Sequence, residues 1–215
     1  MNRIAILFTT LLLAGATGCS TVYYNTMEKF GVHKRDIMVD RVKDARDAQQ
    51  DAKKEFANAL EQFKSVVAVK GGNLEAKYNK LSAALQKSEA QATEVRDRIA
   101  AVEDVSSALF KEWKAELKQY SNADLRRTSE QKLKEAQARY KDLIAAMKQA
   151  ESRLEPVLQP LRDQVLFLKH NLNAKAIGGL TEEVTAIQAK VDQLVRDMEA
   201  SIREANAFIA TLGAS

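Results

Sequence analysis

The stretch LEAKYNKLSAALQKSEAQATEVRDRIAAVEDVSSALFKEW, residues 74–113, decides the fold of this chain. Mostly apolar residues recur in it every three or four positions, as they do where one face of a helix packs against a partner. We call such a row of residues a stripe. Its members are Leu74, Tyr78, Leu81, Leu85, Ser88, Ala92, Val95, Ile99, Val102, Leu109 and Trp113. Because neither glycine nor proline interrupts the pattern, the stretch predicts one long amphipathic helix.

Similar stripes lie on either side of this stretch, over residues 42–67, 133–161 and 180–198. Glycine pairs at 71–72 and 178–179 mark two breaks, and Asn122 and Asp124 offer turn and capping chemistry at a third. We expect no strand. The expected helices are 34–69, 74–119, 124–172 and 180–212, preceded by a short helix at 22–30.

These helices predict an all-α fold, an elongated antiparallel coiled coil or four-helix bundle over residues 34–215. Short connections make neighbouring helices antiparallel, and spacing near 3.5 residues favours coiled-coil packing. At 1.5 Å per residue, the two middle helices would be about 70 Å long and the outer two about 50 Å. A hairpin around residues 108–137 should therefore project beyond the outer helices, at the end where the chain starts. There the segment 22–30 could cover Phe110, Trp113 and Leu117.

Two prolines, Pro156 and Pro160, fall inside the third long helix. Each removes a helical hydrogen bond and crowds the preceding turn. The apolar stripe nevertheless continues past both prolines, so we expect a kink there and not a break. A curved surface for a membrane or partner is the functional interpretation, and an accommodated bend is the structural one.

The charge balance argues against nucleic acid as a partner. The chain has 33 basic and 29 acidic residues, a net charge of +4, and removal of a signal containing Arg3 would leave +3. Basic and acidic residues also interleave along the helices, whereas a nucleic-acid-binding protein concentrates positive charge on one face.

The N-terminus has the features of a secretory signal over residues 1–18. A basic residue, Arg3, precedes an apolar run of 11 residues, from Ile4 to Ala14, and small residues follow it. The run is too short to span a bilayer as a helix, which takes about 20 residues. We therefore expect cleavage of the signal and not a permanent membrane span.

The residues that follow, Ala16-Thr17-Gly18-Cys19, resemble the bacterial lipobox, which implies cleavage before Cys19 and acylation of this residue. Residues 19–33 would then form a lipid-anchored segment with a short helix. Cys19 is the only cysteine, so no intramolecular disulfide competes for it. Ser20 follows it, and the resemblance to sorted lipoproteins then implies the outer membrane. Ordinary cleavage with an incidental thiol is the alternative.

No arrangement of residues indicates catalysis, a metal site or a cofactor. The two histidines, His33 and His170, have no cysteine, histidine or carboxylate at a spacing typical of a zinc site. Pairs such as Glu112 and Glu116 are surrounded by lysines, which favours surface ion pairing over acid–base chemistry. We expect a protein that is not an enzyme.

The projecting hairpin contains the candidate contact residues. Phe110, Trp113 and Tyr120 are aromatic side chains that could anchor a partner or lie at a headgroup boundary. Arg126 and Arg127 beside the turn could meet anionic headgroups. Core packing of Trp113 and simple solvation of the two arginines are the alternatives.

Residues 18–42, GCSTVYYNTMEKFGVHKRDIMVDRV, and the helical chain after them carry a family resemblance. The chain resembles a family of bacterial envelope lipoproteins catalogued as domain of unknown function 2959, over nearly its whole length. The resemblance implies a lipid anchor and an all-helical body. It supplies no activity, substrate or catalytic residue.

Together these features predict a lipoprotein that is anchored in the outer membrane, faces the periplasm and acts as a structural or protein-interaction module, a scaffold or tether. We expect it to contact the membrane through acyl chains on Cys19 and to bind an envelope protein partner. A membrane-shaping or lipid-contacting helical module is the alternative. Formation of a homo-oligomer stays open.

Overall fold

The computed structural model describes Tyr24, Met27 and residues 31–68, 73–173, 177 and 180–213. The long helices are α2 (Lys34–Val67), α3 (Leu74–Glu116), α4 (Ala123–Ser152), α5 (Leu154–His170) and α7 (Thr181–Gly213). No strand occurs in this described part of the chain. The predicted all-α fold is confirmed, and most helix ends agree with the expected ones to within three residues.

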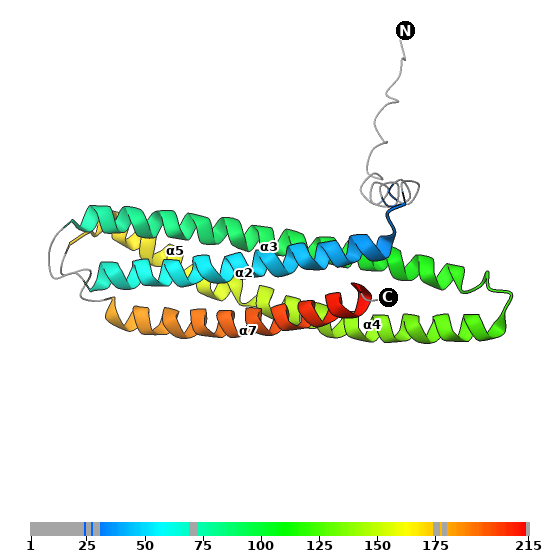
Figure 1. Ribbon diagram of the computed structural model, residues 1–215. Coiled ribbons are helices and arrows are strands. Elements are labelled where there is room, and N and C mark those ends of the chain that lie inside the picture. The colour runs from blue at the N-terminus through cyan, green and yellow to red at the C-terminus, as the bar shows by residue number, and fades with distance from the viewer. Residues whose placement is uncertain are drawn as a thin grey trace, which may run out of the picture.

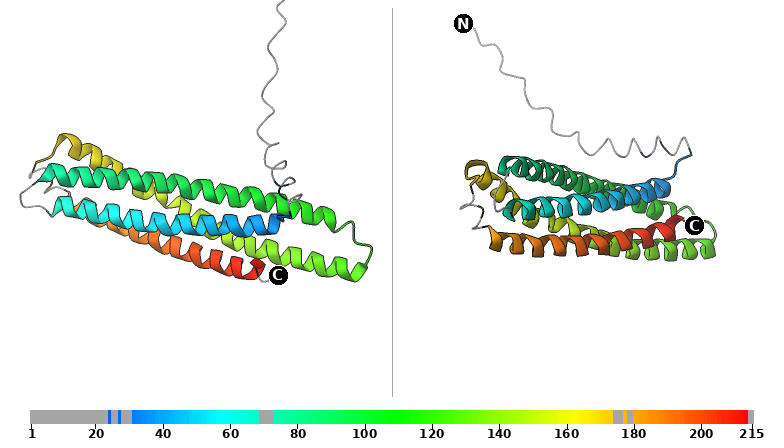
Figure 2. Two further views of the ribbon diagram at one scale, coloured as in Figure 1. Left: turned by 45° about the horizontal axis from the view of Figure 1, so that its top comes forward. Right: turned by 60° about the vertical axis from the view of Figure 1, so that its left-hand side comes forward.

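The helices pack side by side into a long rod (Figure 1). α2 packs against α3 and α7, and the α4–α5 pair packs against these same two helices, so the cross-section has four corners. Figure 2 shows the same arrangement from two other sides. Neighbours run antiparallel, as the short connections required.

Ion pairs join each neighbouring pair of helices along the rod. Asp44 on α2 lies 3.5 Å from Arg98 on α3, and Glu103 on α3 lies 2.9 Å from Lys148 on α4. Arg153, between α4 and α5, pairs with Asp197 on α7, and Lys53 on α2 pairs with Glu199 on α7. All of these groups are at least partly exposed, so each surface pair adds little to stability.

The core consists of the stripe positions that the sequence predicted. On α3, Leu81, Val95 and Ile99 are fully buried, and so is the polar Ser88. The hydroxyl of Ser88 donates to the carbonyl oxygens of Ala84, at 3.0 Å, and of Glu55 on α2, at 3.2 Å. These bonds remove the cost of burying a hydroxyl, which is why a serine can occupy a stripe position.

The third predicted helix is two helices in the structure, separated by Arg153. This residue keeps right-handed helical angles, with φ −86° and ψ −13°, so the chain bends without reversing. Pro156 has no N–H to donate to the carbonyl of Ser152, and its ring crowds that carbonyl. The bend therefore falls just before Pro156, whereas Pro160 stays inside α5. Its consequence is a change of neighbour, because α4 packs more against α7 than against α3, whereas α5 packs about equally against both.

A helical hairpin projects from one end of the rod, as predicted (Figure 1). We take the hairpin as residues 108–140. Lys34, the first residue of α2, already lies beside Glu112, with 2.8 Å between Nζ and Oε1. Beyond that level, every residue from Lys114 to Lys132 is exposed except Leu117, Ser129 and Glu130. The last turns of α3 and the first turns of α4 thus extend past α2 and α7.

Tyr24 and Met27 are the described residues of the expected short helix at 22–30, and both are helical. The hydroxyl of Tyr24 donates a 2.6 Å hydrogen bond to Oδ2 of Asp104 on α3, and the side chain is only 4% exposed. Gly31 then adopts a left-handed φ of +81°, which glycine tolerates best. Tyr24 is therefore fixed to α3 before α2 begins.

Candidate functional site: the projecting hairpin

The turn of the hairpin is set by Asn122. Its side-chain oxygen accepts hydrogen bonds from the backbone N–H groups of Asp124, at 2.9 Å, and Leu125, at 3.1 Å. This is the capping chemistry that the sequence predicted, and it starts α4 in a fixed direction. The turn consequently holds two apolar side chains in solvent, Tyr120 at 42% exposure and Leu125 at 57%.

Two basic side chains lie next to these apolar ones. Arg127 pairs with Asp124 one turn earlier, and both groups are well exposed. Arg126 makes no ion pair within the described part of the chain. The tip therefore presents Tyr120, Arg126 and Arg127 to solvent.

The other two aromatic candidates act inside the hairpin. Trp113 is half-buried against the core, and its Nε1 donates a 2.8 Å hydrogen bond to Oγ of Ser129 on α4. Phe110 is 9% exposed and packs edge-on against Tyr140, with 5.5 Å between ring centroids. Burial raises the pKa of the Tyr140 hydroxyl above its ordinary value. These side chains join the arms of the hairpin, and Phe110 is not available as a surface contact.

The hairpin carries most of the net charge of the chain. Residues 108–140 contain eight basic and five acidic side chains, a net charge of +3. The rest of the chain contains 25 basic and 24 acidic side chains. A surface with this excess of positive charge attracts anionic partners over a distance of about 10 Å at moderate salt.

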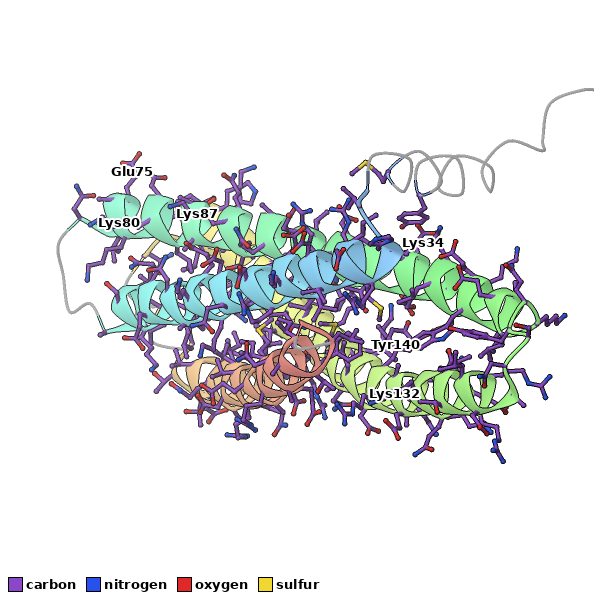
Figure 3. All side chains as sticks on the ribbon, turned by 45° about the vertical axis from the view of Figure 1, so that its right-hand side comes forward. Lys34, Glu75, Lys80, Lys87, Lys132 and Tyr140 are labelled. Atoms are coloured by element: carbon purple, nitrogen blue, oxygen red, sulfur yellow. The ribbon has the colours of Figure 1, made fainter. Side chains whose placement is uncertain are left out.

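A cavity of about 260 Å³ lies at the base of the hairpin, where α7 ends. Its lining is Arg35, Trp113, Lys132, Glu135, Ala136, Arg139, Phe208, Thr211 and Leu212. Figure 3 shows Lys132 on α4 near this end, far from Lys80 and Lys87 on α3. Sequence reasoning missed the cavity. The available signal was the early end of the last helix, which uncovers α4 there.

The described residues contain no candidate metal site and no membrane-spanning helix. They include no group of three or more histidine, cysteine or acidic side chains placed to hold a metal ion. His33 precedes α2 without a side-chain capping bond, and His170 is the last residue of α5. Among the described helices, none is both long and apolar enough to cross a membrane. The expected signal, residues 1–18, and the expected attachment residue Cys19 lie outside the described residues.

Comparison with known proteins supplies a family and no activity. No curated protein matches the chain. One family model matches residues 23–212, which includes every long helix of the rod except the last residue of α7. The chain therefore belongs to the family described as protein of unknown function DUF2959.

Proposed function

We propose that this protein is a non-enzymatic scaffold of the bacterial envelope, anchored in the outer membrane through acyl chains on Cys19 and facing the periplasm. The observation that carries the proposal is the projecting hairpin, which holds Tyr120 and Leu125 in solvent on a surface of net charge +3. A large exposed aromatic next to arginine is typical of a contact site between proteins. The rigid rod behind the hairpin would set the distance between the anchor and the docked partner.

The expected partner is an envelope protein with an acidic surface. Like charges across an interface are unfavourable, so the excess of basic side chains selects against basic partners. Arg126 makes no direct ion pair with the described residues, so it can pair with a partner's carboxylate. The exposed faces of Tyr120 and Leu125 would supply the apolar contact.

Photo-crosslinking in intact cells tests the scaffold. A photoreactive residue at Tyr120 or Leu125 should give a discrete adduct with an envelope protein. The matched control is Phe167, which is 41% exposed on α5 at the opposite end of the rod. The same adducts from both ends, or no protein adduct from the hairpin, would contradict the proposal.

The anchor is tested separately, by mass spectrometry of the mature protein from membranes. The expected N-terminal peptide begins at an acylated Cys19, and Cys19→Ser should release the protein from the membrane fraction. One acyl chain binds a membrane only weakly, so a diacyl or triacyl group is expected. An unmodified cysteine in native cells would remove the tether and leave the hairpin result intact.

A second candidate function is contact of the hairpin with anionic headgroups, and the position of Tyr24 favours it. Tyr24 comes five residues after Cys19, so the chain between them, whatever its path, spans at most about 18 Å. From Asp104, the partner of Tyr24, α3 runs about 18 Å further to Glu116. A rod standing with its hairpin toward the membrane would therefore bring Arg126 and Arg127 to the headgroups.

Vesicle co-sedimentation separates this candidate from the scaffold. Unlipidated protein should bind phosphatidylglycerol vesicles at low salt, and Arg126→Glu with Arg127→Glu should abolish binding, because headgroup attraction is electrostatic. The control is Lys80→Glu with Lys87→Glu, the same change of charge at the other end of the rod (Figure 3). Absence of binding at low salt would exclude the lipid-contacting alternative and leave the protein partner.

A further inference from the structure

We propose that the cavity at the base of the hairpin binds a single-chain anionic amphiphile, an acyl chain that ends in a carboxylate or phosphate group. The site is separate from the exposed tip and goes beyond the proposed scaffold function. It exists because α7 ends at Gly213 while α4 continues toward the tip, so the corner of the bundle that α7 fills is open beside Ala136 and Lys132.

The floor of the cavity suits a narrow apolar chain. It consists of Trp113 from α3, Ala136 from α4, and Phe208 and Leu212 from α7. Phe208 is 3% exposed and Ala136 is 8% exposed, so the floor is continuous with the core. A volume of about 260 Å³ is slightly below the range of about 300–1,000 Å³ that is typical of pockets for drug-sized ligands. One alkyl chain fits this space better than a branched or polycyclic ligand.

The rim of the cavity selects an anionic head. Lys132 and Arg139 lie two turns apart on α4, and neither makes an ion pair or hydrogen bond with the described residues. Arg35 adds a third cation, 3.8 Å from its own neighbour Asp36. The only carboxylate in the lining, Glu135, already accepts a 3.0 Å hydrogen bond from Gln131. The excess of cations favours a carboxylate or phosphate over a neutral or cationic head.

Two hollows elsewhere on the rod lack this combination. The groove that contains Lys80 and Lys87 is lined otherwise by Asn58, Gln62 and two alanines, so it has cations but no aromatic floor. In a second hollow between α2 and α3, half of the lining residues are acidic, among them Asp44 and Asp51 on α2 and Glu94 on α3. Cationic rim and apolar floor coincide at the base of the hairpin.

Trp113 makes the proposal directly measurable, because it is the only tryptophan of the chain and lines the cavity. The mature chain, residues 19–215 without an acyl group, contains every described residue. It is titrated with decanoate and decyl phosphate below their micellar concentrations, and tryptophan emission is recorded. Both anions should give a saturable change. Decyltrimethylammonium should bind about tenfold more weakly or worse, because its head is repelled by the rim.

The variants separate the rim from the floor. Lys132→Ala with Arg139→Ala should weaken decanoate binding by about tenfold or more, since two charge-assisted contacts are lost, and should leave decanol binding unchanged. Lys80→Ala with Lys87→Ala is the matched control and should bind decanoate as the unaltered chain does. All four side chains are exposed, so circular dichroism should show the same helix content in each protein.

Three results would overturn the site. They are a signal that never saturates, equal binding of cationic and anionic amphiphiles, and insensitivity to the Lys132 and Arg139 changes. Isothermal titration calorimetry repeats the test in case the emission of Trp113 does not respond. Binding to anionic vesicles with no binding of monomeric amphiphile would also refute the cavity site, and would place the lipid contact on the hairpin surface. Failure here leaves the crosslinking test of the scaffold unaffected.

Discussion

The indole Nε1 of Trp113 donates a 2.8 Å hydrogen bond to Oγ of Ser129, 16 residues later in the chain. The bond joins α3 to α4 close to the level at which α2 begins and α7 ends. Both side chains are half-buried, so water only partly replaces the bond when it is lost. This contact, with the Phe110–Tyr140 ring pair, fixes the two arms of the hairpin relative to each other.

Ser129→Ala should loosen the arms. Loss of the acceptor leaves a half-buried indole N–H without its partner, so the free energy of unfolding should fall by about 0.5–1.5 kcal/mol. Acrylamide should also quench Trp113 more strongly, because the ring gains freedom to face solvent. Thr128→Ala is the control, since its hydroxyl bonds only to the carbonyl of Asp124 in its own helix. Unchanged quenching in Ser129→Ala would show that the bond does not hold the indole in place.

Asn122→Ala should destabilise the start of α4. The two backbone N–H groups that Asn122 accepts from would lose their capping partner, at a cost of about 1 kcal/mol. Urea unfolding measures the change. Asn122→Asp keeps an acceptor at the same place and should restore most of the stability. A loss of equal size in both variants would mean that the cap is not the cause.

Glu155 should make stability depend on pH in the acid range. Hydrogen bonding to Arg162 lowers the pKa of the Glu155 carboxyl below its ordinary value of 4.5, and Arg96 contributes. A carboxyl with a lowered pKa stabilises the fold above its unfolded pKa, and this contribution is lost as pH falls through the folded value. Glu155→Gln should therefore cost stability at neutral pH and almost none in acid well below the folded pKa of this carboxyl. The carboxylate is half-exposed, so we expect only about 0.2–1 kcal/mol.

Urea titrations of both proteins at the two pH values give this difference. Glu204→Gln is the control, an exposed carboxylate that has no ion pair among the described residues. Its effect should not change with pH in the same way. A cost of Glu155→Gln that persists undiminished in acid would rule out the ion pair as its origin.

Gln49→Met should stabilise the bundle. Gln49 is fully buried on α2, and within the described residues neither its amide oxygen nor its amide nitrogen has a hydrogen-bond partner. Methionine has a similar unbranched shape without the buried amide, so we expect a gain of about 1–2 kcal/mol. Thermal unfolding measures it. Gln86→Met, at an exposed position of α3, should give no such gain. A lower midpoint for Gln49→Met would show that the amide is satisfied in solution.

The sequence predicted the helices well because each stripe has a single physical cause, the burial of one face of the helix. Val95 and Ile99 are fully buried as their spacing implied. Asn122 was recognisable as a helix cap because few residue types can accept hydrogen bonds from the free N–H groups at a helix start. Local patterns of this kind are readable without knowledge of the neighbours.

The features that the sequence analysis missed depend on contacts between distant segments. A kink at the prolines was expected, but the different neighbours on its two sides were not: α4 packs more against α7 than against α3, whereas α5 packs against both. The cavity depends on where α7 ends, near Leu212, relative to Ala136 on α4, which lies 76 residues earlier in the chain. Phe110 was expected at a surface and is buried, because Tyr140 from α4 covers its edge. In each case the partner comes from another helix, and spacing along one helix does not reveal it.

α2 begins and α7 ends before the tip of the hairpin is reached, so the rod is less tightly packed there than in its middle. At the hairpin each helix has one neighbour where the middle of the rod provides two, so local opening there requires less free energy. Backbone amides of residues 114–132 should exchange with deuterium far sooner than those around Val95. A molecule that binds the hairpin would slow this exchange. Binding would then reduce the local motion of the hairpin without any change in its average structure.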